Sequence, residues 1–500
     1  MKAENGLPRL TPTTFKATII NNISMEIVSI TAEIGLDVGH NYAGGLGVLE
    51  GDKFYASARL GVNYTVLTLF YHKGYVRYDD NLNPLGEEDQ SDIKLRKIGE
   101  AVLQTKRGDV RVEYLEYRIN TSRVIFIKSV SPDWAIKATE RLYLEDSEDD
   151  KFYKYLILAK ASENFITNFI GWDNVKYVDL QESYPALIVL LRYFPRYRVI
   201  IHTPAPWGHP SFPLKYFREE LGFELPFDPV VMTEIALSSS VEGIVVSKKM
   251  LHHVRRTFPH HFYKIRAVTN AVEIPRWQHS LLREVKGFED FVRKRREIKT
   301  ESLMKLGRGE GTNRVVIGWA RRVTQYKRPD FILRLIDEVK DSVFFILGGK
   351  PHPREYFGLE VLKRFKEVSR KYSNVLFVNN VGINEERLII WASDIWAFTP
   401  FSGWEASGTS FMKAGVNGVP TVASRDGAVP EIIKDGYNGW LYGEDRTELL
   451  PPDRYDHEYE EFKRKVNEAL NHYEEVGYNA YLTFPKFCSM ERYFKQMGFI

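Results

Sequence analysis

The chain has 500 residues, of which 44% are apolar and 27% charged, and its formal net charge is +3. This composition is typical of folded globular proteins, and the length corresponds to roughly two to four domains. The nearly neutral charge gives no electrostatic case for nucleic-acid binding, which would call for a basic domain or stripe. No stretch approaches the roughly 18 consecutive apolar residues of a membrane-spanning helix. We therefore expect a globular enzyme or binding protein with no nucleic-acid or membrane partner.

Two features bear on the compartment. Cys488 is the single cysteine, which excludes an internal disulfide and favours a reducing setting. Residues 1–10 have no apolar run behind a basic start, so we predict no secretory signal. Together they predict a cytoplasmic protein.

The first half alternates predicted strands and helices, the pattern of a parallel sheet with helical crossovers. Residues 97–130 differ, because alternating segments flank a turn-like 106–109 and predict inserted antiparallel hairpins. The other expected elements are strands over 25–34, 62–69, 176–180 and 198–201, and helices over 49–60, 152–169 and 186–193.

A charged, helix-favouring stretch over 276–307 is interpreted as a connector to a second α/β series. That series has expected strands over 314–319, 342–347, 374–378, 394–398 and 420–424, and helices over 329–339, 356–372, 385–392 and 409–417. We predict an α/β protein whose two doubly wound Rossmann-type domains, 1–275 and 276–480, face each other across a cleft. By analogy with this architecture, residues 481–500 form a helix returning to the first domain. Ligands in such sheets bind beyond the carboxyl ends of the strands.

Two motifs at these strand ends suit anions. Gly44-Gly45-Leu46-Gly47 precedes a predicted helix, where glycines admit a ligand close to the backbone and free N–H groups face an anion. A tight strand–helix turn is the alternative. Four cations follow the strand over 314–319 and could clamp phosphate, or form a solvated basic loop; they are Arg321, Arg322, Lys327 and Arg328.

Histidines occur in two settings. His202 and His209 stand in the proline-rich stretch 201–210 beside Trp207, where aromatic and hydrogen-bonding groups suit a sugar subsite or, alternatively, a structural role. A second group has no nearby cysteine and no interleaved carboxylate, so we interpret it as a solvated helix face and loop and predict no metal site. Its members are His252, His253, His260 and His261.

The segment 404–413 is the most informative. It enters a predicted helix, so the stretch from Ser407 to Ser410 can offer N–H groups and hydroxyls to an anion. Glu405 can accept hydrogen bonds from sugar hydroxyls. Lys413 follows two apolar residues and is either a surface lysine or a buried amine suited to covalent attachment of a carbonyl group.

Here the sequence resembles the α-glucan (glycogen, starch, maltodextrin) phosphorylase family, as a short-form member. The family motif EASGTxxMK, followed by NG and DG, matches residues 405–413, Asn417-Gly418 and Asp426-Gly427. The likeness covers most of the chain. It includes the glycine-loop region over 29–75, an LNDxHPAL-like stretch over 180–187, His202-Thr203-Pro204, Thr269-Asn270, an RxxxYKR match over 322–328 and a GGK loop over 348–353.

The resemblance implies a GT-B-like fold and reversible phosphorolysis of α-1,4-glucans to glucose 1-phosphate with retained configuration. It implies pyridoxal 5′-phosphate on Lys413, whose 5′-phosphate helps substrate phosphate to protonate the glycosidic oxygen. The implied catalytic residues are Arg322, Lys327, His202 and Glu405, and the implied cofactor-binding residues are Lys413, Thr409, Ser410, Gly45 and Lys327. The implied substrate-binding residues are Gly44, Gly45, His202, Asn270, Glu405, Ala406, Ser407 and Gly408. The expected partners are an α-1,4-glucan and inorganic phosphate. The sequence leaves open whether the chain forms a homo-oligomer.

One position separates this family from its neighbours. Nucleotide-sugar transferases of this architecture carry a second glutamate eight positions after the first, where this chain has Lys413. Some segments depart from the family: residues 181–184 read Gln-Glu-Ser-Tyr, alanine follows Asn270, and 419–431 is closer to synthases. Two alternatives therefore remain, an ADP- or UDP-glucose-dependent glucan synthase and a non-catalytic glucan-binding relative.

Overall fold

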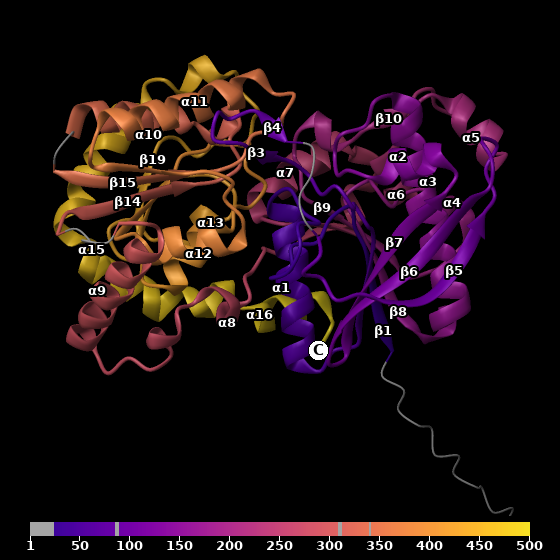
Figure 1. Cartoon of the computed structure of the whole chain (residues 1–500), viewed down its shortest axis with the longest axis horizontal. Coiled ribbons are helices and arrows are strands. Elements are labelled where there is room, and N and C mark those ends of the chain that lie inside the picture. The colour runs from indigo at the N-terminus through magenta and orange to yellow at the C-terminus, as the bar shows by residue number, and fades with distance from the viewer. Residues whose placement is uncertain (1–24, 86–89, 309–312, 340–341) are drawn as a thin grey trace, which may run out of the picture.

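The computed structural model describes residues 25–85, 90–308, 313–339 and 342–500. The prediction about a secretory signal in residues 1–10 lies outside these ranges. The described chain forms two lobes side by side, and each contains a mostly parallel sheet between helices (Figure 1). This confirms the predicted α/β architecture of two doubly wound domains.

The first lobe is built on a sheet of order β13-β12-β9-β8-β1-β2-β7-β6-β5. Its strands from β13 to β7 run parallel, and β6 and β5 continue the sheet antiparallel to β7. The predicted hairpins therefore exist, but they extend the main sheet. The strands are β1 Glu26–Ile30, β2 Tyr64–Leu69, β5 Arg96–Leu103, β6 Val110–Ile119, β7 Ser122–Ser131, β8 Val175–Gln181, β9 Tyr197–Ile201, β12 Glu242–Val245 and β13 Ile265–Ala267.

Helices of the first lobe flank this sheet. They are α1 Gly45–Leu60, α2 Asp133–Thr139, α3 Glu148–Phe165, α4 Ile188–Leu191, α5 Leu214–Leu221, α6 Met232–Ser239 and α7 Lys248–Thr257. The helix predicted over 186–193 is wrong in extent, because turns occupy 182–187 and only α4 is helical. Two short ribbons, β3 Arg77–Tyr78 with β4 Pro84–Leu85 and β10 Ser211–Phe212 with β11 Val230–Val231, were not predicted.

The second lobe has an all-parallel sheet of order β16-β15-β14-β17-β18-β19. Its strands are almost entirely buried and apolar, as expected for parallel strands covered on both faces. They are β14 Val315–Ala320, β15 Val343–Gly348, β16 Val375–Val378, β17 Ile395–Phe398, β18 Thr421–Ser424 and β19 Trp440–Tyr442. The chain reverses its direction of strand addition between β14 and β17, which places a ligand-binding crevice at their carboxyl ends.

Two helical layers cover this second sheet. Helices α10 Pro329–Val339 and α11 Tyr356–Lys371 and the first part of α15 Glu458–Cys488 pack on one face. Helices α12 Ile383–Ala392 and α13 Ser410–Val416 pack on the other. The predicted connector contains α8 Ile274–Trp277 and the long helix α9 Phe288–Lys305, which lies against α12.

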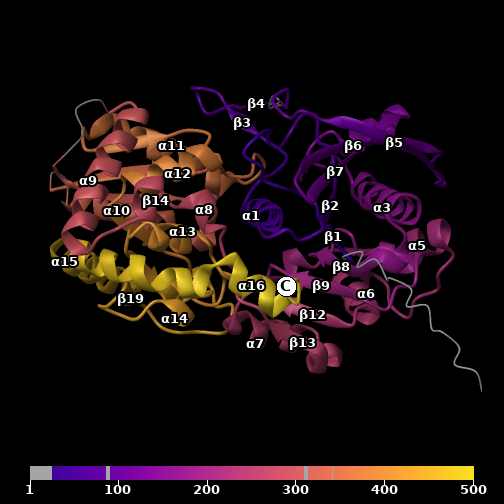
Figure 2. The same cartoon turned by 90° about the horizontal axis from the view of Figure 1, so that it is seen from below.

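The end of the chain crosses between the lobes (Figure 2). Helix α15 runs along the second lobe and is followed by α16 Met490–Met497, whose Met490, Tyr493 and Phe494 join the core of the first lobe. Glu491 also pairs with Arg59 of α1 at 2.7 Å. Among the described helices, none is long and apolar enough to cross a membrane.

Candidate active site

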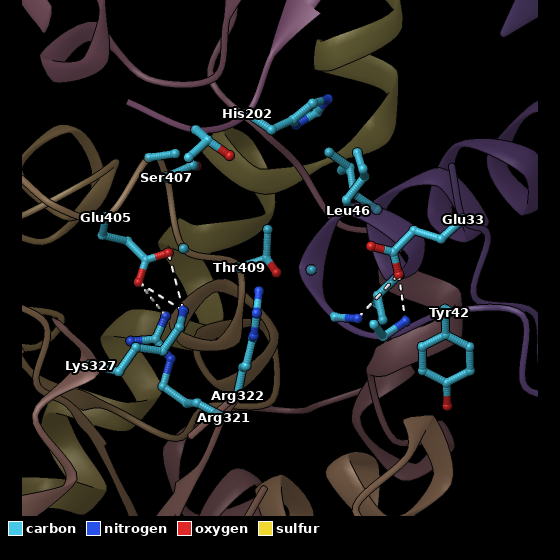
Figure 3. Close-up of a pocket in the computed structure, with 18 of the residues that line it drawn as sticks. Glu33, Tyr42, Leu46, His202, Arg321, Arg322, Lys327, Glu405, Ser407 and Thr409 are labelled. Atoms are coloured by element: carbon cyan, nitrogen blue, oxygen red, sulfur yellow. Dashed lines mark hydrogen bonds and ion pairs between the residues drawn. The ribbon is translucent and has the colours of Figure 1, made fainter. Parts of the chain in front are cut away.

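A cavity of about 570 Å³ opens between the lobes at the carboxyl ends of both sheets. In the second lobe it lies beyond β14 and β17. In the first lobe it lies beyond β1 and β8, where that sheet also reverses its strand order. The cavity is therefore bounded by the switch points of both sheets. At a switch point the loops after two neighbouring strands lead to opposite faces of the sheet, which leaves a crevice between them. Figure 3 shows the principal side chains.

Glu405 is the centre of a buried charged cluster on the second-lobe wall. Its carboxylate accepts hydrogen bonds from Arg321 Nη2 at 2.7 Å and from Lys327 Nζ at 3.0 Å (Figure 3). Burial opposes ionisation, but the charges of Arg321 and Lys327 prevail and lower the pKa of Glu405 to about 2. Burial, reinforced by the charge of Arg321, lowers the pKa of Lys327 to about 8 despite the nearby carboxylate. The predicted sugar acceptor and a predicted phosphate ligand are thus ion-pair partners.

The four cations predicted from 321–328 separate into two groups. Arg321, Arg322 and Lys327 line the cavity, and Arg321 Nη1 is buried with no hydrogen-bond partner among the described residues. Arg322 extends into the space between the lobes (Figure 3). The prediction is wrong for Arg328, which has φ +48° and turns into the core, where it pairs with Glu458 at 2.6 Å.

The glycine loop lies opposite these cations. A Cβ at Gly44 or Gly45 would meet no heavy atom within 4 Å, so both residues leave the cavity open, whereas a Cβ at Gly47 would come within 2.6 Å of Glu33. The N–H groups of Ala43 and Gly44 donate to the Glu33 carboxylate at 2.5 and 3.2 Å (Figure 3). Helix α1 begins at Gly45, so its first N–H groups lack carbonyl partners within the helix.

The remaining predicted sugar ligands lie on the cavity wall near His202. Burial lowers the pKa of His202 to about 3, so its ring is neutral at neutral pH. Gln181 donates its amide to Ser29 and therefore accepts from His202 Nε2 at 2.8 Å, which leaves His202 Nδ1 as an acceptor. Asn270 Oδ1 and Ser407 Oγ line the same cavity, and each is buried without a partner among the described residues. Unsatisfied polar atoms of this kind favour a polar ligand.

The loop that carries Glu405 is fixed by Asp426. This carboxylate accepts from the N–H groups of Gly403 at 2.7 Å and Glu405 at 2.7 Å, although burial raises its pKa to about 7. Gly408 has φ +76°, and a Cβ there would lie 2.5 Å from Phe398, so glycine is required. Ala406 is held through its carbonyl, which accepts from Ser247 Oγ at 2.5 Å.

Lys413 lies deep in the cavity on α13. Its side chain is 4% exposed, its Nζ donates to Glu386 at 2.8 Å, and it lies 3.9 Å from the centre of the Trp277 ring. Thr409 and Ser410 line the cavity one turn earlier, but Ser410 Oγ also accepts from Trp396 at 3.2 Å. The predicted site residues from 44–45, 202, 270, 321–328 and 405–413, other than Arg328, therefore line one cavity, and Lys413 is a buried member of that lining.

Of the four acidic residues that line the cavity in the described part of the chain and were not predicted as ligands, two follow strands at the switch point of the first-lobe sheet. Glu33 also accepts from Tyr143 at 2.7 Å, and burial raises its pKa. Glu182 has φ +60°, accepts from the His202 N–H at 2.9 Å, and has a second oxygen that is buried without a partner among the described residues. Burial raises the pKa of Glu182 to about 8. The available sequence signal was their place directly after β1 and β8, since the sheet switch point selects those loops.

The interpretation of the second histidine group holds for His252 and His260, which are exposed. It is wrong for His253, which lies on the inner face of α7, and for His261 in the 3-10 turn after that helix, because both are buried and His261 pairs with Glu234 at 2.5 Å. The described residues contain no group of three or more histidine, cysteine, aspartate or glutamate side chains placed to hold a metal ion.

Known proteins resemble this chain in sequence and in fold. Residues 314–450 match the family profile "Glycosyl transferases group 1". The maltodextrin phosphorylase of Thermococcus litoralis is 26% identical over 81% of this chain and 61% of its own length. The glycogen phosphorylase of Mycobacterium tuberculosis strain H37Rv is 24% identical over 83% of this chain and 62% of its own length.

These matches leave part of the relatives uncovered, since the chain spans about three-fifths of either phosphorylase. Among solved structures, the catalytic domain of starch synthase IV from Arabidopsis thaliana, bound to ADP and acarbose, superposes with a TM-score of 0.75. That likeness covers 95% of this chain and 98% of the other at 15% identity, so it shows the fold. The chain therefore has the GT-B fold of glycosyltransferases and resembles the glycogen and maltodextrin phosphorylases over about four-fifths of its length.

Proposed function

We propose that the protein is an α-glucan phosphorylase, which cleaves α-1,4-glucans with inorganic phosphate to give glucose 1-phosphate. The observation that carries this proposal is the union, in one cavity, of a buried lysine at 413 with the cations Arg321, Arg322 and Lys327. A cavity for two neighbouring phosphate groups needs such a concentration of positive charge. Sugar-sized space and unsatisfied polar atoms adjoin it.

The residues present fit pyridoxal 5′-phosphate. Lys413 supplies an amine with a carboxylate partner, Glu386, and apolar side chains such as Leu46 and Ile383 line the same cavity and could contact a flat ring. Lys327 and the first turn of α1, on opposite walls of the cavity, would offer a cation and free N–H groups to the phosphate of the cofactor. When bound, the cofactor would supply a phosphate group that exchanges protons with substrate phosphate.

The chain's own residues would bind and orient the reactants. Arg321 and Arg322 would hold substrate phosphate. The positive charge of Lys327 would offset the repulsion between substrate phosphate and the cofactor's phosphate. His202 Nδ1 and Asn270 Oδ1 would accept hydrogen bonds from the glucosyl hydroxyls, and Ser407 Oγ would donate one to them or accept one from them. Because the cavity is bounded by both lobes, a closing motion of the lobes would exclude water from it.

The test combines activity with the site of cofactor attachment. Full-length protein incubated with pyridoxal 5′-phosphate, maltoheptaose and phosphate should release glucose 1-phosphate. Borohydride treatment followed by peptide mass spectrometry should place the added mass on the peptide that contains Lys413. Protein that takes up no cofactor and forms no glucose 1-phosphate would rule the proposal out.

One observation favours a second candidate, a glucan synthase that uses ADP- or UDP-glucose. The ion pair of Lys413 with Glu386 and its contact with Trp277 give this lysine a structural role that needs no cofactor. A synthase would transfer glucosyl units from the nucleotide sugar in protein free of pyridoxal phosphate. A non-catalytic relative would bind maltodextrin and carry out neither reaction.

We expect kcat/KM for phosphorolysis to fall above about pH 8. Lys327 is cationic below its pKa of about 8 and neutral above it, so its attraction for phosphate is lost as the pH rises through that value. Lys327→Arg should remove this decline, because a guanidinium stays charged. The control is Lys299→Arg, because Lys299 has a side chain only 11% exposed, pairs with Asp394 and lies outside the cavity lining, so its substitution should leave the profile unchanged. A decline that persists unchanged in Lys327→Arg would assign it to another group, such as Glu182.

A further inference from the structure

A second cavity, of about 710 Å³, lies beside the first. It is bounded by the loop 204–209, helices α6 and α7, and residues 447–449 of the second lobe. The loop belongs to both cavities: Pro204 lines each of them, Trp207 and Gly208 face the first, and Pro206 and His209 face the second. The two spaces therefore meet along one short segment of chain.

Stacked aromatic rings lead from the first cavity to this loop. Tyr326 and Trp404 have ring centres 6.5 Å apart and an interplanar angle of 18°, and Trp404 and Trp207 are 5.6 Å apart at 30°. All three line the first cavity, yet Trp207 is 62% exposed. Trp404 Nε1 donates to the carbonyl of Leu450 at 3.1 Å, which ties the rings to the segment bordering the second cavity. An exposed tryptophan held in a stack offers a rigid apolar face at the mouth.

The second cavity combines apolar faces with neutral hydrogen-bonding groups. Phe227, which is 58% exposed, and Phe258 contribute aromatic surface. His253 Nε2 is buried with no partner among the described residues. Burial lowers the pKa values of His253 and His209 to about 4, so both rings are uncharged at neutral pH.

The charges around this second cavity argue against an anionic ligand. Arg256 is engaged with the backbone carbonyls of Thr447 and His252, at 2.7 and 3.2 Å, while Glu234 and Glu448 add carboxylates to the wall. A neutral ligand with apolar faces and a hydroxyl rim matches this lining better than phosphate does. Glucose units have both properties.

We propose that Trp207 and the second cavity bind the part of an α-glucan chain that lies beyond the unit held in the first cavity. This inference rests on the proposed function for the nature of the chain, and it assigns the binding of longer glucans to residues outside the reacting centre. One glucose ring stacks on the exposed face of Trp207. The following units lie along Pro206 into the second cavity, where Phe227 and His253 contact them.

The test measures binding by calorimetry, using full-length protein loaded with pyridoxal 5′-phosphate and the probes maltotriose and maltoheptaose. Trp207→Ala should weaken maltoheptaose binding roughly five- to tenfold, the size of effect expected for one lost aromatic contact. Phe227→Ala should weaken maltoheptaose and leave maltotriose unchanged. Both side chains are largely exposed, so folding should be preserved. Tyr193→Ala, at a tyrosine 85% exposed elsewhere on the first lobe, is the matched control and should change neither affinity.

The possible results separate this inference from the proposed function. Maltoheptaose binding that is unchanged in Trp207→Ala and Phe227→Ala overturns the inference even if phosphorolysis is intact. Absence of glucan binding in the unmodified protein overturns both. Chain-length-dependent binding that both substitutions reduce supports the inference, even if no glucose 1-phosphate forms and the phosphorylase assignment fails.

Discussion

Lys413→Arg is expected to lower phosphorolysis by on the order of 10³-fold or more while the protein stays folded. Arginine keeps the positive charge opposite Glu386 and can stack on Trp277, so the buried contacts of this position survive. A guanidinium cannot replace the lysine amine as the attachment point for pyridoxal phosphate. The measurements are the rate of glucose 1-phosphate release, cofactor absorbance and the melting temperature.

A pair of companion variants separates attachment from packing. Lys413→Ala leaves Glu386 without its 2.8 Å partner, so it should lower the melting temperature as well as the activity. Adding Glu386→Gln should restore stability without restoring phosphorolysis, because the amine is still absent. Lys465→Arg is the matched control, since Lys465 is also buried and paired, with Asp435 at 2.7 Å, but lies outside the cavity. Phosphorolysis within tenfold of the unmodified protein in Lys413→Arg would contradict a covalent role.

The sequence predicted the architecture well where apolar runs alternate with amphipathic helices. The helix over 329–339 has the predicted bounds, and every strand predicted in the second lobe is present. Such elements are determined by local patterning and by burial on both faces of a parallel sheet. The helix predicted over 186–193 is wrong in extent, since turns that start at Glu182 with φ +60° continue to residue 187 and α4 covers only Ile188–Leu191. The residue types in this stretch do not indicate such a turn.

Pairing within the site could not be predicted from spacing. Arg321 and Glu405 are 84 positions apart, and nothing local indicates that a predicted phosphate ligand holds a predicted sugar ligand. Lys327 and Arg328 are neighbours in a basic run, yet Lys327 lines the cavity and Arg328 is buried against Glu458, 130 positions away. Arg328 has a left-handed backbone conformation, with φ +48°, which the spacing of the basic run does not indicate. Motifs therefore located the loops, whereas tertiary contacts decide which side chains face the ligand.

The contact between Glu405 and its two cations leads to the second large effect. Glu405→Gln should lower kcat/KM by roughly 10²-fold or more, because the hydrogen-bond acceptor weakens and both cations lose the partner that fixes their positions. Removing one member of a buried ionic cluster should also reduce the free energy of unfolding, by roughly 3 kcal/mol at neutral pH. Denaturant unfolding and initial rates of phosphorolysis measure the two effects.

The pH dependence makes this prediction specific to the cluster. The pKa of Glu405 in the folded protein, about 2, is below the ordinary value of 4.5, so its stabilisation is present above about pH 4.5 and is lost as the pH falls toward 2. The stability difference between the unmodified protein and Glu405→Gln should therefore shrink over that range. The alkaline decline in kcat/KM should move below pH 8 in the variant, because the carboxylate that raises the pKa of Lys327 is absent.

Glu100 provides the matched control: it pairs with Lys97 and Arg111, each at 2.9 Å, but on an exposed strand, where solvent screens the charges. Glu100→Gln should change neither the rate nor the stability appreciably, and equal effects of both substitutions would show that the buried site around Glu405 has no special role.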